Sequence, residues 1–236
     1  NQDRFSNGIC FYAVAKYSPN YIVWVVFNMK NPLLFLFLVI YTILLGLLLE
    51  EFLNINKLAI STIAEQLTKE QLEKVLDFNT RWKWLGYAIV PLLLLIKTHL
   101  IATIVNIGTF FYNYEISYAK IYNIVLKSEF VFLLAIFAKG SWFYFYQTEF
   151  TILDFQNFYP LSFLNIVDYK TLDPWLAYPF QTLNLFEVVY VFLLTFFIKK
   201  ALNIKIIDSF LLIAISYGVG LILWIATVMF IVLNYS

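Results

Sequence analysis

Long apolar runs constrain this sequence more than any other feature. A helix needs about 20 mainly apolar residues to cross the hydrocarbon layer of a bilayer. Lipid-exposed backbone must satisfy its own hydrogen bonds, and the alternating segments typical of β-barrels do not occur in the chain. We therefore expect an all-α fold, a polytopic transmembrane helical bundle of five spanning helices. The predicted spans cover residues 32–49, 85–107, 121–146, 179–198 and 206–233.

The composition favours a membrane protein and excludes several other classes. Hydrophobic residues make up 62% of the 236 residues and charged residues 13%, against about 45–50% and about 25% in ordinary globular chains. Sixteen basic and 15 acidic residues give a net charge of +1, so no charge field indicates a nucleic-acid partner. The partners that we expect are membrane lipids and other membrane protein subunits.

Three segments are predicted to lie outside the hydrocarbon. Residues 1–31 include a nine-residue apolar stretch, 21–29, that is too short to span and is interpreted as an interfacial segment. Thr68 and Gln71 fit a capping box, which predicts an amphipathic surface helix over 68–80. Residues 147–178 are rich in aromatic and polar side chains, with prolines as breakers, and we expect a loop packed at the membrane surface.

The distribution of lysines near the spans indicates the orientation. Lys30 precedes the first span and two glutamates follow it, while Lys199, Lys200 and Lys205 cluster between the fourth and fifth spans. Basic residues concentrate in cytoplasmic segments of membrane proteins. We therefore expect a cytoplasmic N-terminus and a C-terminus outside, in a membrane that is interpreted as the bacterial inner membrane.

The second span carries the first group of polar residues inside the bilayer. Ionisable side chains in hydrocarbon are expensive, so each of them needs a structural or functional reason. Lys97 and His99 lie two residues apart, about 200° around a helix, and cannot share a face. Thr103 and Asn106 follow His99 in a stripe that we expect to face other helices. The stripe indicates either a polar site or proton relay, or hydrogen bonds that hold helices together in lipid.

The fourth and fifth spans add further candidates. Asn184 and Glu187 lie on a polar edge near the start of the fourth span, where Glu187 is interpreted as a partner for Lys97, with Glu129 as the alternative partner of that lysine. In the fifth span, small residues predict close helix packing. They are Ser216, Gly218 and Gly220, and Gly46 in the first span is a further candidate.

Familiar catalytic patterns do not occur in the sequence. One histidine and one cysteine cannot form a multi-histidine metal site or a thiolate cluster. A glycine-rich phosphate loop and a Gly-x-Ser-x-Gly elbow are both missing. The chain is therefore interpreted as a non-enzymatic protein with no cofactor, no metal and no catalytic residues.

The segment Pro174-Trp-Leu-Ala-Tyr-Pro-Phe-Gln-Thr-Leu-Asn-Leu-Phe-Glu187 and the helix after it resemble the Yip-domain (Ypt-interacting-protein) family, in particular its bacterial membrane members. Similar proteins have a short aromatic approach to the fourth helix, then a lysine hairpin and a glycine-containing last helix. The resemblance covers roughly residues 30–236 and implies an integral membrane protein of five helices. It implies no catalytic residues.

These features lead to two main hypotheses about function. The first is a subunit or scaffold of a larger membrane assembly, similar to Yip-domain proteins. The second is a transporter or permease subunit that uses a polar intramembrane site made of Lys97, His99 and Glu187. The sequence shows neither internal repeats nor short broken helix pairs, which argues against the second hypothesis. A lipid-modifying enzyme is a third alternative, for which no acid–base pair can be assembled.

Overall fold

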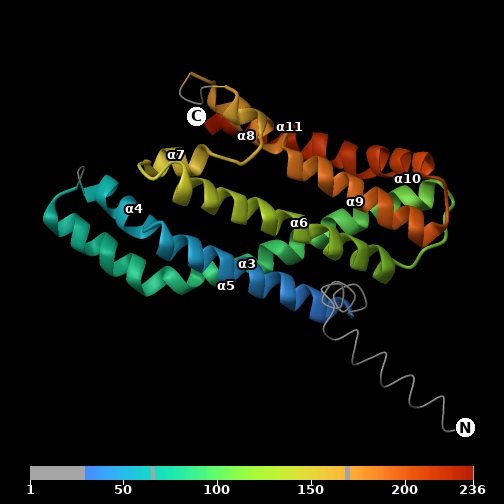
Figure 1. The fold of residues 1–236 in the computed structure, drawn as a ribbon, viewed down its shortest axis with the longest axis horizontal. Coiled ribbons are helices and arrows are strands. Elements are labelled where there is room, and N and C mark those ends of the chain that lie inside the picture. The colour runs from blue at the N-terminus through green and yellow to red at the C-terminus, as the bar shows by residue number, and fades with distance from the viewer. Residues whose placement is uncertain (1–29, 65–66, 168–170, 236) are drawn as a thin grey trace, which may run out of the picture.

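The computed structural model describes residues 30–64, 67–167 and 171–235. The regular elements in these ranges are helices, with one isolated β-bridge and no strand, which confirms the all-α prediction. Most of the predicted interfacial segment 1–31 lies outside the described residues. The helices run side by side along one long axis (Figure 1).

Four of the described helices are long and apolar enough to cross a bilayer, so the chain has the architecture of a multi-pass membrane protein. Three of them are single helices, and the fourth is continuous through α10 (Ile206–Ile213), the π-helical turn η2 (Ala214–Gly218) and α11 (Val219–Tyr235). The three single helices are α3 (Asn31–Phe52), α5 (Lys69–Phe111) and α6 (Tyr118–Phe145).

The predicted single helix over 179–198 is wrong in its form, because the structure divides this region into two helices. Helix α8 (Pro174–Thr182) packs against α11, and α9 (Leu185–Leu202) packs against α10 and α6. The chain leaves helical geometry at Leu183 and is extended at Asn184, whose φ is −135°. Together α8 and α9 lie along the last helix of the chain, with a break part of the way (Figure 1).

Helix α5 also differs from the prediction. The expected surface helix over 68–80 and the second span over 85–107 form one helix of 43 residues, with Pro91 inside it. At 1.5 Å per residue the helix is about 65 Å long, about twice the hydrocarbon thickness. The predicted capping box is present, because Thr68 and Gln71 exchange hydrogen bonds between side chain and backbone.

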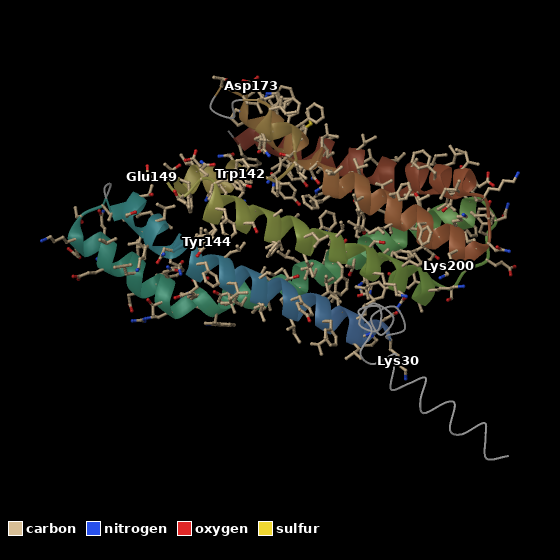
Figure 2. All side chains as sticks on the ribbon, in the orientation of Figure 1. Lys30, Trp142, Tyr144, Glu149, Asp173 and Lys200 are labelled. Carbon is tan, nitrogen blue, oxygen red and sulfur yellow. The ribbon has the colours of Figure 1, made fainter. Side chains whose placement is uncertain are left out.

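The predicted aromatic loop 147–178 contains short helices. They are α7 (Ile152–Asn157), the 3₁₀ turn η1 (Phe163–Asn165) and the first part of α8. Phe143 of α6 anchors this region, because its ring contacts those of Phe150, Phe155 and Phe158 at centroid distances of 4.6–5.3 Å. Trp142 and Glu149 lie toward this end of the bundle, and Lys30 and Lys200 lie at the other (Figure 2).

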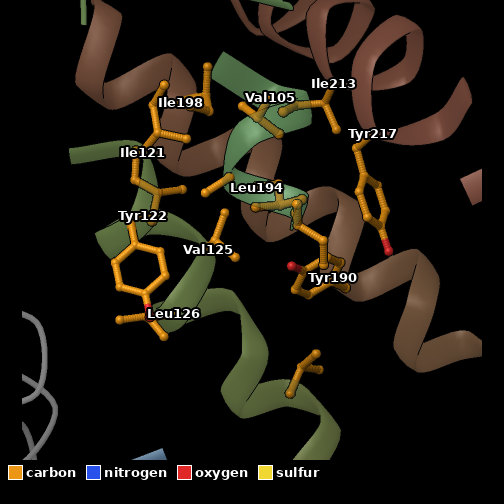
Figure 3. Close-up of a cluster of buried hydrophobic side chains, with 14 of the residues drawn as sticks. Val105, Ile121, Tyr122, Val125, Leu126, Tyr190, Leu194, Ile198, Ile213 and Tyr217 are labelled. Carbon is orange, nitrogen blue, oxygen red and sulfur yellow. The ribbon is translucent and has the colours of Figure 1, made fainter. Parts of the chain in front are cut away.

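Helix α6 is the centre of the bundle. Half of its most apolar 18-residue window is buried, against 17–22% for the other three long helices. Its neighbours are α3, α5 and α9, and α4 (Ile55–Ala64) lies at one end of the molecule. The core contains Val105 of α5, Val125 of α6, Leu194 of α9 and Ile213 of α10 (Figure 3). The other three long helices expose much of their apolar surface, as lipid-facing helices do.

Close helix packing occurs at some of the predicted small residues. Ser216 lies against Gly108 of α5, where a Cβ added to the glycine would lie 2.6 Å from the Ser216 Cβ atom. Gly220 lies against the side chain of Ile104. Gly218, by contrast, does not face another helix, because a Cβ at that position would meet only the Ile213 carbonyl of its own helix.

Two further glycines, Gly46 and Gly140, differ in whether they allow close helix packing. Gly46 is not a packing residue, since nothing lies within 4 Å of the position that its Cβ would occupy. Gly140 of α6 is a packing residue, because an added Cβ would overlap the side chain of Leu49 on α3. The closest approaches therefore link α5 to the last helix and α6 to α3.

Candidate intramembrane polar site

The first part of the site is an ion pair between two helices. The Nζ atom of Lys97 on α5 lies 2.9 Å from Oε2 of Glu129 on α6. The same Nζ atom lies 4.0 Å from the centroid of the Phe132 ring. The Lys97 side chain is 44% exposed, whereas that of Glu129 is only 2% exposed. The buried carboxylate therefore depends on a cation that approaches from the lipid-facing side.

The second part is a hydrogen bond between α9 and the last helix. The Tyr217 hydroxyl donates to Oε1 of Glu187 at 2.5 Å. Tyr217 belongs to the π-helical turn η2, a local distortion that is frequent at functional sites. Figure 3 shows Tyr217 and Tyr190 in the same buried cluster, and their ring centroids are 5.3 Å apart.

Asn184 connects the two half-helices at the break between α8 and α9. Its Oδ1 atom accepts from the backbone N–H of Glu187 at 2.8 Å, and so caps α9. Its Nδ2 atom donates to the carbonyls of Gln181 and Thr182 at the end of α8, both at 3.0 Å. One amide side chain thus satisfies backbone groups on both sides of the break.

The connection between α7 and α8 supplies the remaining backbone bonds at the break. The Phe163 N–H donates to the Leu183 carbonyl at 3.0 Å, and the Leu185 N–H donates to the Leu161 carbonyl at 3.1 Å. These bonds form the isolated bridge between Ser162 and Asn184. Non-helical backbone at membrane depth is tolerated where protein surrounds it and satisfies its polar groups.

Several buried polar atoms at the site have no well-formed hydrogen bond. They are Oε1 of Glu129, the hydroxyl of Tyr190 and Oγ of Ser162. The Tyr190 hydroxyl lies beside the Glu129 carboxylate but without hydrogen-bonding geometry. Buried polar side chains in proteins are largely paired, so each such atom requires an explanation.

The charges at the site do not balance. Lys97 is the cation that acts on Glu187, and Glu129 is a second carboxylate close by. Burial, together with Glu187 and Glu129, raises the pKa of Tyr159, in the connection before η1, to about 12. Tyr159 therefore stays protonated at neutral pH and remains a hydrogen-bond donor. Two carboxylates and one lysine give the ionised cluster a net charge of −1.

The structure brings some of the predicted site residues together and separates others. Lys97, Asn184 and Glu187 lie in this site, although Lys97 bonds to Glu129, the alternative partner, and not to Glu187. His99 lies outside it, with its ring 4.3 Å from that of Tyr122, which is about two turns before Glu129 on α6. The buried face of α5 passes through Thr98, so Lys97 and His99 flank that face and reach different parts of α6.

The stripe faces another helix only in part, because the His99 ring packs against Tyr122 of α6 whereas Thr103 is exposed. His99 and Thr103 are exposed, and their side chains bond to carbonyls one turn earlier, those of Leu95 and His99. Asn106 is half-buried and lines an open hollow by the connection between α5 and α6. Threonine can satisfy its hydroxyl on its own helix, so Thr103 needs no partner helix.

Sequence reasoning missed three residues of the site. Tyr190, Tyr217 and Ser162 looked like ordinary aromatic or loop positions. Tyr190 is three residues from Glu187, and Tyr217 lies between Ser216 and Gly218, but neither spacing indicates that the two rings meet. Ser162 reaches the site through the backbone pairing at the break, for which no local signal exists.

A second polar cluster lies at the C-terminal end of α3. Oε1 of Glu50 lies 2.5 Å from Nζ of Lys83, and Oε2 accepts from the Tyr87 hydroxyl at 2.6 Å. Asn56 also donates to this carboxylate. Both oxygens of the Glu50 carboxylate have partners, so the cluster fixes α3 and the start of α4 against α5.

Comparison with known proteins found no matching family model, no matching curated protein and no matching solved structure.

Proposed function

We propose that this multi-pass membrane protein is a non-enzymatic subunit of a transporter or permease, and that it handles a small cation or a proton at the site of Lys97, Glu129 and Glu187. The observation that carries the proposal is the break between α8 and α9, which coincides with this cluster. Interrupted helices at membrane depth are the common way in which transporters expose backbone and polar groups to a charged ligand.

Two further observations support this function. Oε1 of Glu129, the Tyr190 hydroxyl and Oγ of Ser162 are buried without a well-formed hydrogen bond, which a purely structural network would supply. Ionisable residues within a membrane segment are costly and commonly mark pathways for ions or protons. His99, which the sequence included in such a site, is not part of the proposed one, because its ring packs near the start of α6.

Flux through purified protein in proteoliposomes tests the proposal. We expect an imposed voltage to drive proton or Na⁺ entry, followed with a trapped pH dye and with ²²Na⁺, and we expect Glu187→Gln to abolish it. The matched control is Glu149→Gln, which removes an exposed carboxylate outside the cluster. Equal flux in Glu187→Gln and wild type, or no flux above that of empty liposomes in protein that also carries its copurified partners, would contradict the proposal.

A second candidate function is a scaffold for a larger assembly, similar to the role implied by the Yip-domain resemblance. The first part of α5 favours it, because this part extends along the molecule beyond the length that a bilayer needs. It carries exposed Phe78 and Trp82 beside the ion pairs of Lys74 and Arg81. The expected location is the bacterial inner membrane, with a cytoplasmic N-terminus.

Native mass spectrometry after mild solubilisation tests the scaffold function. A stoichiometric partner that is lost when Phe78 and Trp82 are both replaced by serine supports the scaffold. Purification of the chain without any other protein, under conditions that preserve known assemblies of the same membrane, argues against it.

A further inference from the structure

We propose that Glu187 binds one exchangeable proton and that the ligand of the intramembrane site is this proton. The inference deepens the proposed function and rests on the same site. It names the ligand and the residue that carries it, and it assigns different tasks to the two carboxylates of the cluster.

The difference between the two carboxylates lies in their hydrogen-bond partners. Glu129 faces the ammonium group of Lys97 at 2.9 Å, and an ammonium group can only donate. Glu187 faces the hydroxyl of Tyr217 at 2.5 Å, and a hydroxyl can donate to a carboxylate or accept from a carboxylic acid. The Glu187 contact therefore survives both protonation states.

Some groups around Glu187 favour its ionised form, and others favour its protonated form. It lies in the first turn of α9, where the partial positive charge of the helix N-terminus and the Asn184 cap favour the ionised form. A second carboxylate nearby and the low dielectric of the bundle favour the protonated form. Glu187 thus lacks the single dominant partner that would fix its charge.

Several elements around Glu187 contribute groups that respond to its charge. The charged groups are one lysine and one glutamate, and the others are tyrosine hydroxyls, which stay neutral. These groups are Lys97 of α5, Glu129 of α6, Tyr159 before η1, Tyr190 of α9 and Tyr217 of η2. When Glu187 takes up a proton, the net charge of the cluster changes from −1 to zero.

The position of Glu187 also allows exchange. Its side chain is half-buried and lies one turn from the break, whereas Glu129 is almost fully buried between helices. The unpaired Ser162 hydroxyl lies at the same break, because Ser162 pairs with Asn184. A proton can therefore reach Glu187 without the opening of the Lys97–Glu129 pair.

Infrared difference spectroscopy of the full chain in lipid nanodiscs tests the inference. A protonated carboxyl group in a low-dielectric site has a C=O stretching band that a carboxylate lacks. We expect such a band to appear reversibly on acidification, to be absent from Glu187→Gln, and to persist in Glu129→Gln and in the control Glu149→Gln. The Tyr217→Phe variant should keep the band and shift it to higher wavenumber, because the O–H of the carboxylic acid loses the hydrogen-bond acceptor that Tyr217 provides.

The result that overturns the inference is a titrating band that persists in Glu187→Gln, or the absence of any such band from the wild type. If Glu187→Gln does not fold, the Tyr217→Phe shift alone decides, since only a proton on Glu187 predicts it. The outcome is separable from that of the flux experiment. If the Glu187 band is present but no proton flux is measured, the proton site stands and the transport function is contradicted. If Na⁺ flux is measured but the band is absent, the transport function stands and the proton site is contradicted.

Discussion

Lys97 and Glu129 form an ion pair in which the lysine is 44% exposed and the glutamate 2% exposed. The pair is therefore asymmetric. A lone Lys97 can extend its stem toward water, whereas a lone Glu129 remains between helices. The cost of breaking the pair should depend on which partner is removed.

We predict that Lys97→Met destabilises the protein more than Glu129→Gln does. Removing one partner of a fully buried pair costs about 3–5 kcal/mol, and the exposure of Lys97 reduces our expectation to about 2 kcal/mol. The double variant Lys97→Met with Glu129→Gln should recover most of the loss, because neither member of the ion pair is left without the other. Thermal unfolding in detergent measures all three. Additive effects would show that the two residues act independently.

Asn184 carries the second prediction. Asn184→Ala removes the cap of α9 and both bonds to the end of α8, and we expect a loss of about 2 kcal/mol of unfolding free energy. Asn184→Asp keeps an acceptor for the cap but loses both donated bonds, so its loss should be intermediate. Asn234→Ala removes one exposed side-chain bond in α11 and serves as the control. Equal stability of the alanine variants at 184 and 234 would contradict the role of Asn184.

Local patterns predicted part of this architecture. The capping box at Thr68 and Gln71 depends on residues three apart, so the sequence was enough to place the start of a helix. The continuity of α5 was missed because charged residues near its start indicated a boundary between water and lipid, which a long helix can cross without a break.

The break at Asn184 shows where such reasoning ends. Pro179 suggested a helix start, because proline is common in the first turn, but it lies within α8. The break depends on Leu161 and Phe163, which are about 20 residues away and supply backbone hydrogen bonds to its ends. Similarly, Glu129 interrupted a predicted span, but only the rotation of α5 and α6 decides that it meets Lys97.

The third prediction concerns the contact between α5 and the last helix. In Gly108→Ala, the new Cβ would lie 2.6 Å from that of Ser216, so the two helices must separate. Overpacking of this kind costs about 1–3 kcal/mol. The control is Gly46→Ala, whose new Cβ meets nothing within 4 Å and should leave stability unchanged or slightly raised. A loss of the same size at both positions would contradict the close contact.

The last prediction concerns the orientation of the bundle. Helix α4 and the connection between α5 and α6 lie at opposite ends of the molecule (Figure 1), and Lys57 on α4 and Glu115 in that connection are exposed. With Cys10 replaced by serine, single cysteines at 57 and 115 report the two sides separately. If the N-terminus is cytoplasmic, a membrane-impermeant maleimide added to intact cells should label position 57 and not 115, and lysis should make both reactive. The expectation follows from Lys30 and the lysines at the end of α9, because the start of α3 and the end of α9 bond to the start of α6, directly after the connection that contains Glu115. Labelling of 115 alone in intact cells would reverse the orientation, and labelling of both would contradict a membrane-spanning bundle between them.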